Sequence, residues 1–350
     1  MIGVLTLSFD PVVVISDTTS VRLETIALAL VLFVGLVLAA WLGRRVGEPA
    51  LRVDDLIFMV VGSVPGAIVG GRVGYVLDHL AYYQTNPNAI VDPAQGGLTL
   101  TLALPFGLLT GAVIGRLLGS PIGRWMHALA LPLLFVLAGG KLAGILGGTG
   151  QGAPSDLQWA TSYAGPGPWG SLAADVPSHP SQVYEAIAIG VAIVALWLVS
   201  HVRLISRRDG AAMWAAIALW CVARFVVGFS WRDPAILGAL RVEQMLALAV
   251  SLVAVAGLAE RARAHRRVDV SAQTTPPVDA APAVDAARVD APVPARVDAP
   301  LPAMIEAPAA TVLEAPATLD ADAAARAEAE ALAEAETPAE GATDPGAAPA

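Results

Sequence analysis

The stretch Ser178-His179-Pro180-Ser181-Gln182-Val183-Tyr184-Glu185 is polar, yet it leads directly into the apolar run 186–198. Counted from Ser181, that run is long enough to cross a bilayer, which takes about 20 residues of helix. The chain therefore carries His, Gln, Tyr and Glu side chains into a membrane or to its edge. Ionisable groups at that depth are costly and mark functional sites, so we expect a polar site here.

The composition of the chain is that of a membrane protein. The 350 residues have a mean hydropathy of +0.64, are 56% hydrophobic and only 15% charged, whereas soluble domains carry about 25% charged residues. The net charge of −9 arises late in the chain, where residues 268–350 hold 15 acidic and 3 basic side chains. This acidity therefore says nothing about a ligand of the membrane part. The single cysteine, Cys221, excludes an internal disulfide and a cysteine metal cluster, and we expect it to pack inertly.

Seven hydrophobic spans have the length that a helix needs to cross hydrocarbon. Their approximate bounds are 24–43, 56–77, 97–118, 125–147, 181–201, 211–231 and 241–259. Residues 1–267 are therefore predicted to form an all-α, integral membrane bundle of seven transmembrane helices. Residues 268–350 are rich in Ala, Pro, Asp and Glu and hold too few large apolar residues to bury a core. Such composition predicts a disordered C-terminal tail.

Basic residues alternate between the connecting loops. Arg116 and Arg124 flank the join of spans three and four. The segments after spans one, five and seven contain Arg44, Arg45, Arg52, Arg203, Arg207, Arg208, Arg261, Arg263, Arg266 and Arg267. The loops 78–96 and 148–180 contain no Lys or Arg, and the loop between spans six and seven has Arg232 and Arg241. By the positive-inside rule, the N-terminus is predicted to lie outside and the C-terminus in the cytoplasm.

Five ionisable residues interrupt the spans in their outer halves. They are Arg72, Lys141, Glu185, Arg224 and Glu243. An isolated charge in lipid costs about 2.5–3.5 kcal/mol, so we expect these groups to face a shared interior. The alternative is that Arg72, Arg224 and Glu185 only pair as contacts between helices, or extend their charged ends to the membrane surface.

The residue types around this depth suit an anionic lipid headgroup. Arg offers a fork that matches phosphate, and Lys offers a compact point charge. His179 can act as a general base, or it can be a residue at a helix start that the loop holds in place. The sequence has no Ser-His-Asp arrangement, no HExxH metal motif and no P-loop. We expect no metal, no cofactor and no nucleic-acid partner, and we interpret 70–74 as close helix packing rather than a nucleotide loop.

The outer loop 148–180 contains Trp159, Tyr163 and Trp169 among Gly, Pro and Ser. Aromatic residues at the level of the headgroups anchor a chain to the membrane surface. Surface anchoring is therefore the favoured interpretation of these residues, and a lid over the polar site is the alternative.

Several motifs resemble those of the prolipoprotein diacylglyceryl transferase family, over about residues 10–260. The most specific is 179–185, His-Pro-Ser-Gln-Val-Tyr-Glu, in the fifth span. The others are Asp10-Pro11, 71–77 with Tyr82-Tyr83, Gly96-Gly97-Leu98, Arg224-Phe225 and Gln244. The resemblance implies the seven-span topology and an enzyme of the bacterial plasma membrane. It also implies transfer of diacylglycerol from phosphatidylglycerol to a cysteine thiol.

The sequence departs from the family pattern at several positions. After span four, Lys141 stands where the family has an arginine, Gly144 and Gly147 where it has asparagines, and Thr149 where it has a glutamate. Further departures are Thr101 for a histidine, Glu24 for a tyrosine and Gly228 for a glutamate, and Arg232 lies one residue later than the pattern has it. The chain is therefore either a divergent transferase or a paralogue that binds lipid or lipoprotein without turnover. Internal repeats that would indicate a transporter are not visible.

The resemblance assigns a role to each candidate residue. Lys141 and Arg224 would hold the phosphate of phosphatidylglycerol and stabilise charge on the departing glycerol phosphate. His179 is the candidate base for the substrate thiol, because the thiolate is the nucleophile. The remaining candidates would bind and orient the substrate: Arg72, Tyr75, Gln182, Tyr184 and Glu185. The implied partners are phosphatidylglycerol, the lipobox cysteine of a prolipoprotein signal peptide, and membrane lipids.

Overall fold

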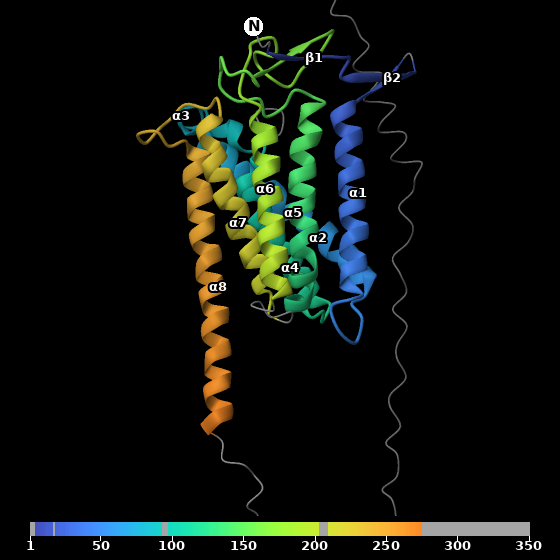
Figure 1. The fold of residues 1–350 in the computed structure, drawn as a ribbon, viewed down its shortest axis with the longest axis vertical. Coiled ribbons are helices and arrows are strands. Elements are labelled where there is room, and N and C mark those ends of the chain that lie inside the picture. The colour runs from blue at the N-terminus through green and yellow to red at the C-terminus, as the bar shows by residue number, and fades with distance from the viewer. Residues whose placement is uncertain (1–3, 17, 93–96, 203–208, 275–350) are drawn as a thin grey trace, which may run out of the picture. The chain divides into compact units, whose positions relative to one another are not determined.

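The structure is a computed structural model that describes residues 4–16, 18–92, 97–202 and 209–274 (Figure 1). Seven of its helices are long and apolar enough to cross a membrane. They are α1 (Leu23–Gly43), α2 (Val53–Asp78), α4 (Leu100–Leu117), α5 (Ile122–Ile145), α6 (Ser181–His201), α7 (Ala211–Val227) and α8 (Val242–Thr274). The short helices are α3 (Leu80–Thr85), η1 (Pro87–Ile90) and η2 (Gly228–Ser230). The predicted all-α bundle of seven spans is confirmed.

The last helix is longer than the span that the sequence predicts. Helix α8 continues to Thr274 and extends beyond the ends of its neighbours (Figure 1). The helix therefore passes the predicted boundary at Val268. The rest of the predicted tail, 275–350, lies outside the described residues.

Four short strands lie at one end of the bundle, which we call the strand end. Strand β1 (Leu5–Ser8) pairs in parallel with β4 (Thr161–Ala164), and β2 (Val12–Ser16) pairs antiparallel with β3 (Thr19–Arg22). The β1–β4 pairing joins the N-terminal segment to the loop between α5 and α6, far away in the sequence. The four strands were not predicted, and they place a small structured cap over the strand end (Figure 1).

Helices α2 and α4 pack closely because glycines recur on their facing surfaces. Gly62, Gly66, Gly70 and Gly74 follow one another at every fourth position of α2. A Cβ on Gly70 would lie 2.5 Å from both the Leu102 carbonyl oxygen and Phe106 Cβ. Small residues let helix backbones approach in this way in membranes. The interpretation of 70–74 as close helix packing is confirmed.

The main hydrophobic core lies among α5, α6, α7 and α8. Its fully buried members include Leu134, Ile189, Trp220 and Cys221. The burial of Cys221 agrees with the expected packing role. Large apolar side chains also cover the outward faces of the helices, as in a bundle that faces hydrocarbon. Examples at least 60% exposed are Phe33, Val61, Leu109, Val191 and Leu252.

Candidate active site

Five helices each deliver one polar side chain near the strand end. Thr101 and Glu243 are the second residues of α4 and α8, and Glu185 is near the start of α6. Lys141 lies near the end of α5, and Arg224 lies in the last turn of α7. Because the helices alternate in direction, positions early in some and late in others reach one depth.

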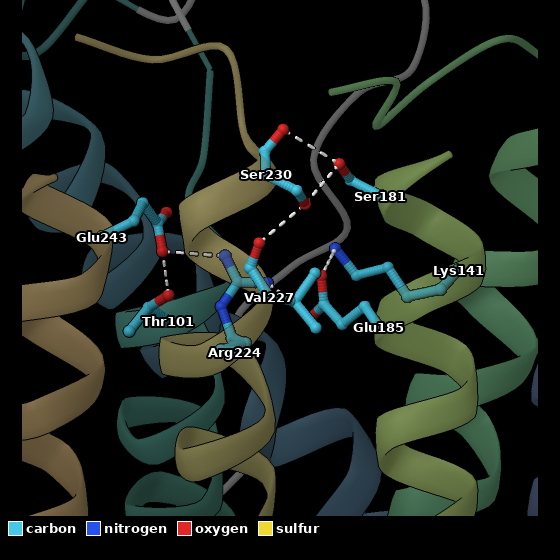
Figure 2. Close-up of polar contacts among 8 residues, drawn as sticks. All are labelled: Thr101, Lys141, Ser181, Glu185, Arg224, Val227, Ser230 and Glu243. Carbon is cyan, nitrogen blue, oxygen red and sulfur yellow. Dashed lines mark hydrogen bonds and ion pairs between the residues drawn. The ribbon is translucent and has the colours of Figure 1, made fainter. Parts of the chain in front are cut away.

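These side chains form a continuous line of contacts across the bundle (Figure 2). Lys141 Nζ lies 2.9 Å from Glu185 Oε2. Arg224 bridges two carboxylates, with Nη1 2.8 Å from Glu185 Oε1 and Nη2 2.8 Å from Glu243 Oε2. Thr101 donates its hydroxyl hydrogen to Glu243 Oε2 (Figure 2). We call these five residues the charge network.

The charge network is buried except at Lys141. The exposed fraction is 1% for Glu185, 5% for Arg224 and 8% for Glu243. The Lys141 side chain keeps 25% of its surface exposed. Two cations and two carboxylates make the network formally neutral, which is how buried charges are tolerated. Of its charged members, Lys141 is therefore the one that a ligand reaches most directly.

Contacts around α7 and α8 hold Arg224 and Glu243 in place. The Arg224 guanidinium lies 4.6 Å from the Trp231 ring centroid and 5.6 Å from that of Trp220. Gln244 accepts the backbone N–H of Arg241 at 3.0 Å and donates to the Phe225 carbonyl at 2.9 Å. These bonds fix the start of α8 against α7, so Glu243 has little freedom to leave Arg224.

The start of α6 presents a second group of side chains on a different face. Trp159 Nε1 donates to the Tyr184 hydroxyl at 2.6 Å, and His179 Nδ1 lies 3.5 Å from the same oxygen. The His179 and Tyr184 rings are 6.0 Å apart in an edge-to-face arrangement. Trp159 is 56% exposed and His179 is half-buried. This imidazole is therefore accessible from the loop side and is oriented by a phenol.

Gln182 ties the start of α6 to the loop that covers it. Its Nε2 donates to the Tyr163 hydroxyl at 3.0 Å, and Gln182 itself is 2% exposed. Burial raises the pKa of the Tyr163 phenol above its usual value. Tyr163 is 2% exposed, and Trp169 packs against it and against Phe9. The prediction of surface anchoring is therefore wrong for Tyr163 and Trp169, because both pack inward between the loop and the N-terminal segment.

A third group surrounds Arg72 at the end of α2. The guanidinium donates to the carbonyl oxygens of Ala89, Ile90 and Asp92 at 2.5, 2.6 and 3.0 Å. The Tyr75 ring stacks on His79 with centroids 4.1 Å apart. Arg72 thus holds the loop that follows α3, and its described bonds are to that loop rather than to the charge network.

Four of the residues that depart from the family pattern lie against one another: Glu24, Gly144, Gly147 and Thr149. Thr149 Oγ1 donates to Glu24 Oε1 at 2.5 Å. A Cβ on Gly147 would collide with the Glu24 carboxylate, and one on Gly144 would lie 2.7 Å from Thr149 Oγ1. The two glycines therefore make room for Glu24 and Thr149. Elsewhere, Arg232 donates to Gly152 O at 3.3 Å and to Ser178 Oγ at 3.1 Å, and so holds the outer loop.

The structure thus separates the predicted site residues into three neighbourhoods. Lys141, Glu185 and Arg224 meet in the charge network, which also includes Glu243. His179, Tyr184 and Gln182 line the start of α6 and its loop, and Arg72 and Tyr75 lie at the end of α2. Thr101 was singled out only as a departure from the family pattern, because a threonine in an apolar helix carries no signal of a functional role.

The fold and the charge network define an integral membrane protein with a polar site inside the bundle. The family model described as prolipoprotein diacylglyceryl transferase matches residues 12–259, and the chain belongs to this family.

Curated relatives carry the name phosphatidylglycerol–prolipoprotein diacylglyceryl transferase. The protein of Solidesulfovibrio magneticus is 33% identical over 270 residues, which cover 73% of this chain and 95% of the relative. That of Cupriavidus pinatubonensis is 28% identical over 299 residues, 77% of this chain and 97% of the relative. That of Geobacter sulfurreducens is 30% identical over 211 residues, 59% of this chain and 76% of the relative. The similarity therefore extends over most of the membrane part.

Proposed function

We propose that this protein transfers diacylglycerol from phosphatidylglycerol to the lipobox cysteine thiol of prolipoproteins. Family membership supports the reaction class. The observation that carries the proposal is Lys141, a partly exposed ammonium held 2.9 Å from Glu185 in an otherwise buried network. The site would lie in the outer leaflet of a bacterial plasma membrane, with the N-terminus outside and the C-terminus in the cytoplasm.

Lys141 is the group that would contact the lipid phosphate. Its ammonium has three donors, and one of them is engaged by Glu185. Glu185 orients the ammonium, and Arg224 fixes Glu185 from the opposite side. Arg224 would therefore support phosphate binding through Glu185, while Lys141 bonds the phosphate directly.

The reaction would be a displacement at carbon. The thiolate sulfur attacks the carbon of the diacylglycerol unit that carries the phosphate ester. An S–C bond forms as the C–O bond between that carbon and the phosphate oxygen breaks. The electron pair of that C–O bond stays on the phosphate oxygen, and glycerol phosphate leaves. A cation held near that oxygen lowers the barrier, because preorganised charge stabilises the charge that develops.

His179 is the proposed base for the thiol proton. Its ring nitrogen lies 3.5 Å from the Tyr184 hydroxyl, so Tyr184 orients the imidazole. Gln182 fixes the loop above this point through Tyr163. Arg72 and Tyr75 would shape the site from a distance by holding the loop after α3.

Turnover by the purified protein tests the proposal. The full chain is reconstituted in vesicles containing phosphatidylglycerol and is given a peptide with a lipobox cysteine. Release of glycerol phosphate together with a diacylglyceryl peptide is expected, and the same peptide with serine in place of cysteine should yield neither. If well-folded protein produces no lipidated peptide, the enzymatic proposal is wrong.

A second candidate is a paralogue that binds phosphatidylglycerol or lipoprotein without turnover. Thr101 favours it, because it stands where the family pattern has a histidine and its hydroxyl is engaged by Glu243. This candidate predicts retention of phosphatidylglycerol without release of glycerol phosphate in the same experiment. Measurable turnover excludes it.

A further inference from the structure

Arg224 is the most highly coordinated charged group of the network. Its two terminal nitrogens each meet a carboxylate at 2.8 Å, from Glu185 on α6 and from Glu243 on α8. It is 5% exposed and lies against the rings of Trp231 and Trp220. A guanidinium held between two carboxylates has its single charge already neutralised. As placed, it is a bridge between helices rather than a free receptor for an anion.

The charge balance of the site depends on Glu243. With both carboxylates present, Lys141 and Arg224 are matched and the network is neutral. Without the Glu243 charge, the network would carry one net positive charge, and Arg224 would attract an anion more strongly. Buried charges interact strongly because little water screens them. The charge of Glu243, on α8, therefore helps to determine the affinity of the site for a phosphate.

Thr101 completes this arrangement from α4. It is fully buried, and its hydroxyl donates to the same Glu243 oxygen that pairs with Arg224. The hydrogen bond from Thr101 fixes the rotamer of Glu243, the second residue of α8. The carboxylate is thus held by two helices besides its own.

We propose that Glu243 and Thr101 are positioning residues that neutralise Arg224 and so reserve Lys141 as the cation that receives the phosphate of phosphatidylglycerol. The identification of the ligand as phosphatidylglycerol rests on the proposed function. The placement of Glu243 between Arg224 and Thr101 does not. This arrangement keeps the site from holding the phosphate so tightly that the departing glycerol phosphate is retained.

Glu243→Gln tests the charge. The amide still accepts from Arg224 but carries no charge, so the network becomes net positive. The dissociation constant for phosphatidylglycerol in nanodiscs should fall roughly tenfold, and KM should fall with it. The value of kcat should not rise, because the product phosphate is also held more tightly. Glu243→Asp keeps the charge and should leave the affinity near that of the parent protein.

Thr101→Val tests the hydrogen bond, since it removes the hydroxyl at nearly constant volume. We expect kcat to fall while phosphatidylglycerol affinity changes little, and Thr101→Ser should restore kcat. Glu260→Gln is the matched control, because Glu260 lies on the same helix and pairs with Arg263 at its exposed surface. It should change neither constant.

The binding measurement separates this proposal from the proposed function. If the parent protein shows no turnover, the transferase proposal fails, and the affinity of Glu243→Gln for phosphatidylglycerol still decides the role of the Glu243 charge. Nanodiscs of phosphatidylethanolamine should show no gain in binding. A folded Glu243→Gln protein with unchanged or weaker affinity for phosphatidylglycerol overturns the inference, and so does an unaltered kcat in Thr101→Val.

Discussion

Lys141 is the residue on which substrate binding should depend most. Lys141→Met leaves Glu185 paired with Arg224 alone and gives the network a net negative charge. Hydrogen bonds to charged groups contribute about 1.5–3 kcal/mol, which corresponds to about 10- to 150-fold in binding. KM for phosphatidylglycerol should therefore rise by about that factor in the vesicle assay. Lys141→Arg keeps the charge and should retain most of the activity.

A matched control separates this local effect from a change in overall charge. Arg263 on α8 is 64% exposed in its side chain and pairs with Glu260. Arg263→Met removes one positive charge from the protein but should leave KM unchanged. An equal KM for Lys141→Met and the parent protein would show that the phosphate binds elsewhere.

At the residue scale, depth within the spans predicted the meeting of Lys141, Glu185 and Arg224. Because consecutive helices run in opposite directions, the position of a residue within its span predicts its depth in the bundle. Charges at the same depth pair, because an unpaired charge in lipid is costly. The same logic placed Arg72 with them, but its guanidinium bonds the loop at 89–92. Depth does not specify which face of a helix a side chain occupies, and backbone carbonyls compete with carboxylates for an arginine.

At the scale of elements, the close packing of α2 on α4 gives a direct test of fold stability. Gly70→Ala places a Cβ 2.5 Å from the Leu102 carbonyl oxygen, and backbone there must move. Overpacking of this kind costs about 1–3 kcal/mol, so the thermal midpoint in detergent should fall.

The control is Gly190→Ala on α6, where a Cβ meets nothing within 4 Å. There, alanine should leave the midpoint unchanged or raise it slightly, because alanine favours helix more than glycine does. Equal midpoints for the two variants would mean that α2 and α4 are not in close contact.

Helices were easier to predict than the strands that accompany them. A span of about 20 apolar residues is a local signal, and all seven were visible. Strand β1 has four residues, and its partner β4 starts at Thr161, so the pairing depends on the tertiary fold. The inward packing of Tyr163 and Trp169 follows from the same pairing. Glu24 and Thr149 are likewise 125 residues apart, and only the fold shows that they form a bonded pair.

At the scale of the whole molecule, the two ends of the bundle differ in charge. Arg44, Arg45, Arg116, Arg261 and Arg263 are exposed in the segments that the predicted topology assigns to the cytoplasm. The loop between α5 and α6, at the strand end, has no Lys or Arg. Basic segments remain on the cytoplasmic side during insertion. The strand end and the charge network beneath it should therefore face the outside, where a lipobox cysteine would arrive.

Cysteine labelling in intact cells tests this orientation, and the native cysteine serves as an internal control. The only native cysteine is Cys221, which is fully buried and should not react. Leu172→Cys lies in the loop between α5 and α6 at a side chain that is 97% exposed, and Ala50→Cys lies in the exposed loop between α1 and α2. A membrane-impermeant maleimide should label Leu172→Cys in intact cells, and Ala50→Cys only after the membrane is broken. The reverse pattern would place the strand end in the cytoplasm, and the charge network would then lie in the wrong leaflet to receive an exported prolipoprotein.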